Sequence, residues 1–205
     1  MKTFKKVISF SIWGDSPFYC QGAIRNAEIA KEIYPDWETR FYVQDIPEDI
    51  KERLKFLNST VIEVQEKNLG AYGAFWRFYC IDDEDVEFMI SRDVDSRLSA
   101  REKHAVDEWI KSGKCFHVMR DHPYHNLPVA AGMWGIRKRD DTVNFDIKNK
   151  IKKWFDENPN VISEGIQKGA DQKFLQDFYF SFLHSGDYFV HDQYLAENLS
   201  VAVSH

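Results

Sequence analysis

Hydrophobic residues along this chain fall into short runs that alternate with longer stretches in which they recur at helical spacing. The run over residues 7–13 stops at Gly14 and Asp15, which predicts a strand followed by a loop, and the helical spacing over 19–34 stops at Pro35. The alternation continues, with further strands predicted at 38–43, 61–64, 88–91, 115–119, 129–136 and 187–191, and further helices at 47–57, 75–81, 100–111, 145–155 and 171–183.

This order of elements predicts an α/β fold. Strands and helices that alternate with short connections form a central, mostly parallel sheet flanked by helices on both faces. Ligands of such sheets bind beyond the carboxyl ends of the strands. Polar residues that directly follow a strand are therefore the first candidates for chemistry.

The composition limits the classes of partner. The 205 residues are 43% hydrophobic and 29% charged, as in folded domains, and the net charge is −6. Binding to nucleic-acid phosphates needs a basic surface, so we expect no nucleic-acid partner. The three cysteines are widely spaced, which favours a reducing compartment and hence the cytoplasm. The basic start leads into a short run broken by serines, and no run reaches the ~20 apolar residues of a membrane-spanning helix, so we expect at most peripheral membrane contact.

One predicted strand, 88–91, leads into two carboxylates with basic neighbours. On an extended segment Asp93 and Asp95 would point to the same side, close enough to share a cation directly or through water. Carboxylate oxygens suit Mg²⁺ or Mn²⁺, which keep positions open for phosphate oxygens. The alternative is a pair of turn carboxylates satisfied by local amides or by Arg92 and Arg97.

Three segments together resemble a known family: 91–97 with this Asp-x-Asp, 132–135 with Gly-Met-Trp-Gly, and 169–175 with Gly-Ala-Asp-Gln-Lys-Phe-Leu. They resemble glycosyltransferases of the GT-A class, in particular small single-domain sugar transferases of bacterial surface-glycan synthesis and of large DNA viruses. The resemblance implies a single Rossmann-like GT-A domain over 1–205, with a nucleotide-binding part at about 1–98 and an acceptor and sugar part at about 99–205.

The implied activity is metal-dependent transfer of a sugar from a nucleotide-sugar donor, with a UDP-sugar favoured, to a glycan or another hydroxyl acceptor. Mn²⁺ or Mg²⁺ would be the cofactor, and the host cytoplasm would be the location if the chain is viral. Two other classes remain open, namely a metal-dependent nucleotidyltransferase or phosphohydrolase, and a binding domain for nucleotide-sugars or glycans without turnover.

The resemblance also implies roles for single residues. Asp93 and Asp95 would hold the metal and through it the donor diphosphate, and Asp93 would also contact the ribose. Arg77 would face the donor, unless its stem only packs on neighbouring aromatic rings. Arg92 would add positive charge at the diphosphate. His191, which follows a late strand, would be a third metal ligand.

Asp171 and Gln172 match an acidic-Gln pair that opens a helix near the reacting carbon. An aspartate at a helix start is also a common N-cap, and the two roles are compatible. In an inverting enzyme Asp171 would take the acceptor proton as general base, whereas in a retaining enzyme it would stabilise the oxocarbenium-like centre. The sequence leaves both outcomes open.

Aromatic and histidine side chains near loops supply the remaining candidates. Trp13 and Tyr19 bracket the loop after the first strand, where one of them would stack on the nucleobase. Asp15 would accept a hydrogen bond from base or ribose.

Gly132 and Gly135 leave room for a sugar to approach the backbone, and Trp134 either offers it a ring face or fills the core. His122 and His125 are candidates for hydrogen bonds to acceptor or donor sugar, with a plain loop role or part of a zinc site as alternatives.

Overall fold

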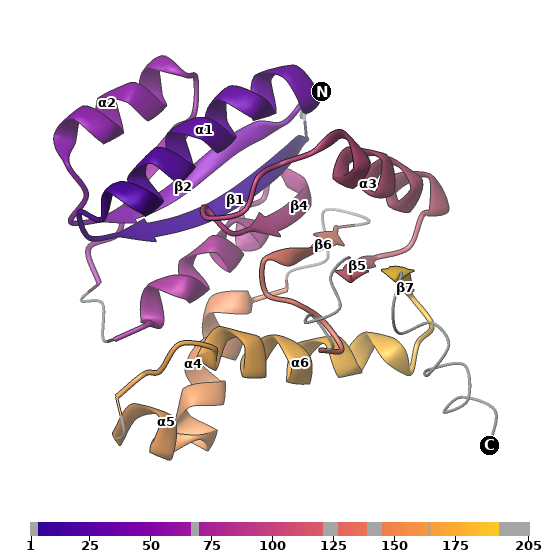
Figure 1. Cartoon of the computed structure of the whole chain (residues 1–205). Helices are drawn as coiled ribbons and strands as arrows, with labels where there is room; N and C mark the ends of the chain where they lie inside the picture. The colour runs from indigo at the N-terminus through magenta and orange to yellow at the C-terminus, as the bar shows by residue number, and fades with distance from the viewer. Residues whose placement is uncertain (1–3, 67–69, 121–126, 139–144, 164, 193–205) are drawn as a thin grey trace.

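The computed structural model describes residues 4–66, 70–120, 127–138, 145–163 and 165–192. Within these residues seven strands form one sheet in the order β3-β2-β1-β4-β6-β5-β7 (Figure 1). The strands are β1 (Lys5–Trp13), β2 (Glu38–Gln44), β3 (Thr60–Glu63), β4 (Val86–Arg92), β5 (Phe116–Arg120), β6 (Met133–Arg137) and β7 (Tyr188–Asp192). Strands β3, β2, β1 and β4 run parallel, β6 runs antiparallel to both of its neighbours, and β7 runs parallel to β5.

Helices cover both faces of this sheet, as the alternation of elements predicts. Figure 1 shows α1 (Pro17–Ile33) and α2 (Glu48–Phe56) on one face, with α4 (Ile147–Glu157) and α6 (Ala170–Leu183) on the other. Residues of α3 (Ala100–Ser112) pack in the same core cluster as those of α1 and α2. The mostly parallel, helix-flanked α/β sheet is therefore confirmed. A short helix that the spacing did not predict, α5 (Pro159–Ser163), follows α4.

The expected helix at 75–81 is a 3₁₀ helix, η1 (Tyr72–Asp82). Three residues per turn place side chains i and i+3 in line. One such row, Phe75 and Phe78, is buried and packs on Phe174 of α6. Another row, Ala74 and Arg77, lines a cavity on the other side of the helix. The 3₁₀ geometry of η1 therefore places Arg77 at the cavity and the phenylalanines of the same helix in the core.

Two other elements are shorter or differently anchored than their patterns predict. The strand expected over 129–136 begins only at Met133, because a turn in which the Met133 amide donates to the Ala130 carbonyl (2.9 Å) precedes it. Helix α4 is capped from a distance, since the Asp82 carboxylate accepts from the amides of Ile147 (2.8 Å) and Lys148 (3.1 Å). The end of η1 therefore fixes the start of α4.

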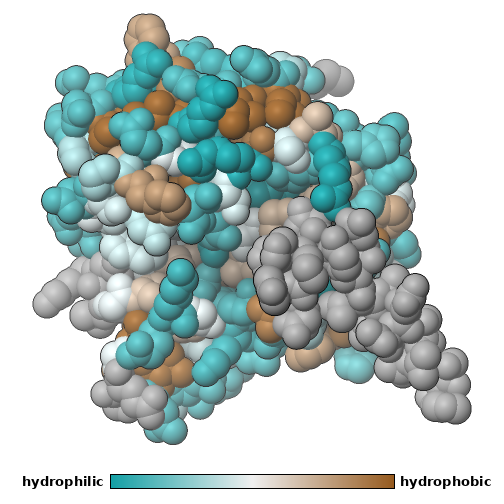
Figure 2. Space-filling view, in the orientation of Figure 1, coloured by the Kyte–Doolittle hydropathy of each residue, from teal (hydrophilic) through white to brown (hydrophobic). Residues whose placement is uncertain are grey.

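The surface in the view of Figure 2 is mainly hydrophilic, with hydrophobic side chains in separate groups over the helices. The most exposed large hydrophobic side chains are Phe56 at 73% and Phe18 at 62%. In the part of the chain that the structure describes, no helix combines the length and the apolar character needed to cross a membrane.

Candidate active site

A cavity of about 1000 Å³ lies at the carboxyl ends of β1 and β4. Its wall is formed by the end of β1, the turn after β4, the segment that enters β6 and the start of α6. This is the edge at which parallel α/β sheets bind ligands. Trp13, Tyr19, Asp93, Asp95 and Asp171 all line it.

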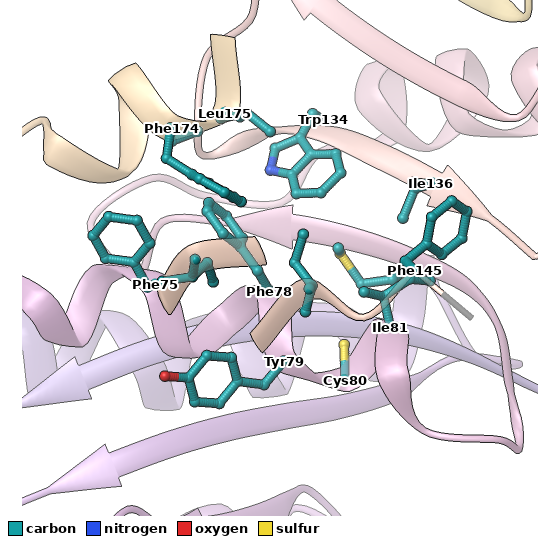
Figure 3. Packing of buried hydrophobic residues seen from close by; sticks show 14 of the residues in the cluster. Phe75, Phe78, Tyr79, Cys80, Ile81, Trp134, Ile136, Phe145, Phe174 and Leu175 are labelled. Carbon is teal, nitrogen blue, oxygen red and sulfur yellow. The ribbon is translucent and has the colours of Figure 1, made fainter. Parts of the chain in front are cut away.

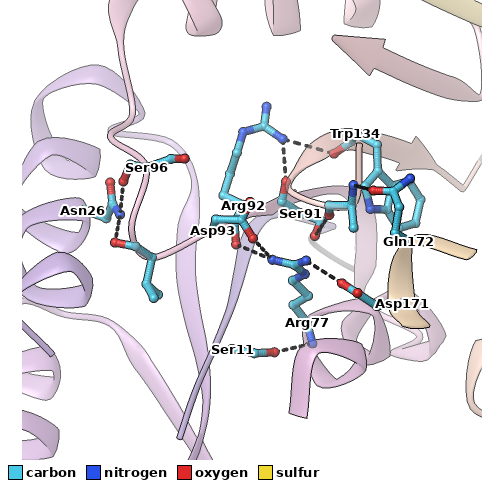
Figure 4. Close-up of polar contacts among 12 residues, drawn as sticks. Ser11, Asn26, Arg77, Ser91, Arg92, Asp93, Ser96, Trp134, Asp171 and Gln172 are labelled. Carbon is cyan, nitrogen blue, oxygen red and sulfur yellow. Dashed lines mark hydrogen bonds and ion pairs between the residues drawn. The ribbon is translucent and has the colours of Figure 1, made fainter. Parts of the chain in front are cut away.

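Arg77 occupies the centre of this site and joins two carboxylates (Figure 4). Its Nη1 donates to Asp93 Oδ1, and its Nη2 donates to Asp171 Oδ2 at 2.8 Å. The side chains of Arg77 and Asp171 are each 8% exposed, whereas that of Asp93 is 43% exposed. The Arg77 amide donates to the Ser11 hydroxyl at 2.8 Å, which ties η1 to β1. The arginine thus connects η1, the end of β4 and the start of α6.

The charges of this cluster are fixed by their mutual contacts. Burial of the Asp93 carboxyl acts to raise its pKa, but the charge of Arg77 and its hydrogen bond outweigh burial and hold the pKa below its ordinary value. The charges of Arg92 and Lys168 act in the same direction. Burial acts to lower the Arg77 pKa, but Asp93 and Asp171 raise it. Asp93 is therefore an ionised carboxylate at neutral pH.

The segment that carries both aspartates is a turn, not the extended segment predicted from the sequence. Val94, at its middle, is 6% exposed and packs in the core, while Asp95 is exposed. Asp95 has no hydrogen bond or ion pair to any residue in the described ranges. The turn therefore buries the residue between the carboxylates and leaves both carboxylates at the cavity.

These two carboxylates fit a divalent cation of the magnesium type. Mg²⁺ is typically held by one or two carboxylates plus phosphate oxygens and water, so two hard oxygen donors beside an open cavity suffice. Among the residues that the structure describes, no group of three or more His, Cys, Asp or Glu side chains is arranged to hold a metal ion. Within those residues, the protein groups that would hold such an ion are therefore Asp93 and Asp95 alone.

Gly132 makes a close approach, as predicted, but the group that approaches it is a protein carboxylate. A Cβ atom at position 132 would overlap the carboxylate of Asp93. Gly135 in turn lies against Ile90 and Trp109, where an added Cβ would come within 3.0 Å of the Ile90 side chain. The absence of a side chain at Gly132 therefore leaves space for the Asp93 carboxylate, and its absence at Gly135 leaves space for core side chains.

The prediction that Trp134 offers its ring to a sugar is wrong. It is 0% exposed and packs on Phe78 (Figure 3), with ring centroids 5.2 Å apart. It also packs on Phe116, whose ring centroid is 5.1 Å away. Side chains alternate between the faces of a strand, so Met133 lines the cavity and Trp134 points into the core below. The core alternative for Trp134 is correct.

Arg92 lines the cavity, but its guanidinium is bonded within the protein. It is 2% exposed, pairs with Glu102, and donates to the carbonyls of Ser91 (2.7 Å) and Trp134 (3.1 Å). Figure 4 shows it pointing away from Arg77. Its positive charge nevertheless acts on the site, because it helps to lower the pKa of Asp93.

The prediction that His191 is a third metal ligand is wrong as well. His191 lies on β7, three strands from β4, which at ~4.8 Å per strand is roughly 14 Å away. Its Nδ1 lies 3.0 Å from Nε2 of His117, and its Nε2 lies 2.8 Å from a Glu108 carboxylate oxygen. Strand β7 is thus an edge strand of the sheet, and His191 on it lies away from Asp93 and Asp95.

The remaining predicted residues divide between the cavity and other places. The Trp13 ring lies against Gly73, where a Cβ would come within 3.0 Å of it, and the side chain is 37% exposed. Asp15 is exposed and does not belong to the cavity wall. His122 and His125 lie outside the described residues.

Asp171 and Gln172, the acidic-Gln pair at the start of α6, bind different partners. Asp171 is the second residue of α6 and makes no capping bond, because its carboxylate binds Arg77 instead. Gln172 lines the cavity, but both ends of its amide bind backbone: Oε1 accepts from the Ala131 amide at 2.8 Å, and Nε2 donates to the Val129 carbonyl. Gln172 is therefore a positioning residue for the segment that enters β6, which corrects its predicted catalytic role.

Other residues line the cavity without having been predicted from the sequence, among them Ser11, Asn26 and Lys168. Asn26 had a readable signal, because it is a polar residue among the small apolar residues Ala23 and Ala27 on the buried face of α1. Ser11 is a hydroxyl within an apolar strand. Lys168 lies in a short loop before α6 and carries no pattern of its own.

Comparison with known proteins supports the fold. No family model matches the sequence, and no curated protein matches it either. Among solved structures, the chain is similar to a glycosyltransferase involved in the glycosylation of the major capsid of PBCV-1, with a TM-score of 0.53 and 17% sequence identity. The similarity covers 92% of this chain and 81% of that one. At this identity the likeness shows a shared fold.

Proposed function

We propose that this protein is a metal-dependent glycosyltransferase that moves a sugar from a nucleotide-sugar donor, with a UDP-sugar favoured, to a glycan or another hydroxyl acceptor. The observation that carries the proposal is the Arg77 bridge between Asp93 and Asp171 at the carboxyl end of β4, with Asp95 beside it. One cavity therefore combines paired carboxylates for a cation with a separate carboxylate for the reacting centre. The likeness in fold to a viral glycosyltransferase supports the proposal.

The donor would be held by residues from three sides of the cavity. Trp13 has one ring face fixed against Gly73 and 37% of its side chain exposed, so with Tyr19 it offers an aromatic surface for a nucleobase. Lys168 is exposed at the cavity wall and would meet phosphate charge. A Mn²⁺ or Mg²⁺ ion held by Asp93 and Asp95 would supply Lewis-acid stabilisation of the leaving diphosphate.

Asp171 would act at the transferred sugar. Arg77 binds its Oδ2, no described residue is hydrogen-bonded to Oδ1, and Asp171 lines the cavity, so Oδ1 is the oxygen that would meet a substrate. In an inverting reaction this oxygen would take the proton of the acceptor hydroxyl, and in a retaining reaction it would stabilise the oxocarbenium-like centre. Arg77 orients the carboxylate for either role.

We place the reaction in the cytoplasm, or in the host cytoplasm if the chain is viral, with at most peripheral membrane contact and no nucleic-acid partner. The acidic net charge of −6 supports the last point. The positive side chains that would meet the donor, Arg77 and Lys168, line the cavity.

A donor panel tests the proposal. The protein is incubated with UDP-, GDP- and dTDP-sugars in the presence of Mn²⁺ or of a chelator, and release of the nucleoside diphosphate is followed. We expect slow hydrolysis of one donor class, strongest for UDP-sugars and abolished by the chelator. Metal-dependent binding of the donor without release, even with glycan acceptors present, would support the binding-domain alternative. Pyrophosphate release from a nucleoside triphosphate and a sugar phosphate would support a nucleotidyltransferase.

A further inference from the structure

Asn26 is a buried polar residue that binds the backbone of the turn carrying Asp95. It lies on α1 and is 1% exposed. Its Nδ2 donates to the carbonyls of Val94 (3.2 Å) and Ser96 (2.8 Å), and its Oδ1 accepts from the amide of Leu98 (3.1 Å). Figure 4 shows the side chain held between the two carbonyls. One amide thus satisfies three backbone groups over five residues.

The helix and the turn also pack closely around the Asn26 side chain. A Cβ atom at Gly22, one turn earlier on α1, would overlap the Val94 carbonyl oxygen. The side chains of Val94 and Leu98 are 6% and 5% exposed and pack in the same core cluster as α1. Helix and turn therefore meet backbone to backbone, which requires a small residue at position 22 and a short polar side chain at 26.

Asp95 depends on this support because its own carboxylate has no partner among the described residues. Arg77 fixes the Asp93 carboxylate, whereas the Asp95 carboxylate makes no hydrogen bond or ion pair within the described ranges. Its direction is set by the backbone on either side of it, at Val94 and Ser96, and these are the two carbonyls that Asn26 binds. Arg97 also donates to both carbonyls, at 3.0 and 2.9 Å, but from an exposed position on the turn itself.

We infer that Asn26 is a positioning residue that holds Asp95 toward the cavity for a divalent cation and the diphosphate it carries, an inference that rests on the proposed function. Leucine at this position would keep the volume but leave the Leu98 amide unpaired and the two carbonyls with Arg97 as their remaining donor, so the turn would shift to rebind these groups. Aspartate would keep the bond to the Leu98 amide but would place an acceptor against two carbonyl oxygens.

The test compares Asn26→Leu and Asn26→Asp with Asn158→Leu. Asn158 is a matched control, because its Nδ2 also donates to a backbone carbonyl, that of Trp154 at 2.8 Å, but at the end of α4 and away from the cavity. Calorimetric titration gives the Kd of UDP with and without Mn²⁺, and hydrogen exchange monitors the Leu98 amide. Thermal unfolding records the stability of each variant.

We expect both Asn26 variants to weaken Mn²⁺-dependent UDP binding on the order of tenfold, the effect of losing an outer-shell partner of a metal site. The Leu98 amide should exchange at least several-fold faster in Asn26→Leu, and Asn158→Leu should change stability without either effect. Unchanged Kd values, or an unchanged Leu98 exchange rate, would overturn the inference. A wild-type protein that binds no UDP with Mn²⁺ would contradict the proposed function and with it the cation role of Asn26, and Leu98 exchange would then report only whether Asn26 holds the turn.

Discussion

Arg77 and Asp171 form a 2.8 Å ion pair, although 94 residues separate them in the sequence. The same guanidinium also binds Asp93, so a single buried cation orders two carboxylates, one at the end of β4 and one at the start of α6. This arrangement distinguishes the aspartates from surface carboxylates. Their positions are defined before any substrate arrives, which is what a site of pre-organised charge requires.

Removal of the bridging cation should destabilise the fold in a pH-dependent way. Arg77→Met leaves Asp93 and Asp171 without their partner, and we expect a loss of about 3 kcal/mol in the free energy of unfolding at pH 7. The lowered pKa of Asp93 means that its contribution is complete above about pH 4, the unfolded value, and is lost as the pH falls through the folded value. The difference between wild type and variant should therefore narrow toward pH 3.

Urea denaturation at pH 7 and pH 3 measures this difference. Arg53→Met serves as the control, because Arg53 pairs with Glu28 on the surface at 3.1 Å and with 45% of its side chain exposed, so the loss should stay below about 1 kcal/mol. An equal loss for Arg77→Met at both pH values would contradict the electrostatic explanation.

Gly132→Ala should damage the site more than the fold. The added Cβ would overlap the Asp93 carboxylate and push it from its position beside Arg77, so we expect at least a tenfold loss of donor hydrolysis. Gly135→Ala, three residues along, would crowd Ile90 in the core instead. It should lower the melting temperature without a specific effect on the apparent Mn²⁺ affinity. Equal effects of the two variants on Mn²⁺ affinity would count against a special role for position 132.

Substitutions of Trp134 and Trp13 should have separate effects, the first on stability and the second on donor binding. Trp134→Phe removes ring volume from the core and should cost about 2 kcal/mol of unfolding free energy while the donor KM stays unchanged. Trp13→Leu removes the exposed ring from the cavity wall and should raise the donor KM several-fold with a small effect on stability. Donor titrations and thermal unfolding of both variants test this, and a raised KM for Trp134→Phe alone would reverse the assignment.

His191→Gln should leave the metal response intact. The imidazole binds Glu108 and His117 at the edge of the sheet, away from the aspartates, so its loss affects the contact between β7 and α3. We expect the Mn²⁺ concentration for half-maximal donor hydrolysis to match that of the wild type within about twofold. A change of tenfold or more in that Mn²⁺ concentration would instead support His191 as a metal ligand.

The alternation of apolar runs and helical spacings predicts most of this fold, because each element buries one face and shows its period in the sequence. Asp93 and Asp95 are predictable for a related reason, since they follow the end of a buried strand. The order of strands in the sheet leaves no such trace, so the sequence alone does not reveal that β7, with His191, lies three strands from β4.

Whether an aromatic residue next to a glycine faces a cavity or the core depends on the strand's register. Trp134 and Trp13 have similar local sequences and opposite environments, 0% and 37% exposed. Asn26 illustrates the reverse case, because a polar residue on the buried face of a helix predicts a bonding partner without revealing which one. Its partner, the turn at 94–98, lies about 70 residues further along the chain.

The central claim is that Asp93 and Asp95 hold a divalent cation that carries a nucleoside diphosphate. Asp95→Asn tests it most directly, because Asp95 is exposed and makes no bond to a described residue, so the substitution should not disturb the fold. The measurement is calorimetric titration of UDP with and without Mn²⁺ into wild type, Asp95→Asn and the exposed-loop control Asp36→Asn. We predict Mn²⁺-dependent binding in wild type and control that weakens at least tenfold in Asp95→Asn. Equal Mn²⁺-dependent affinity in all three proteins would contradict the claim.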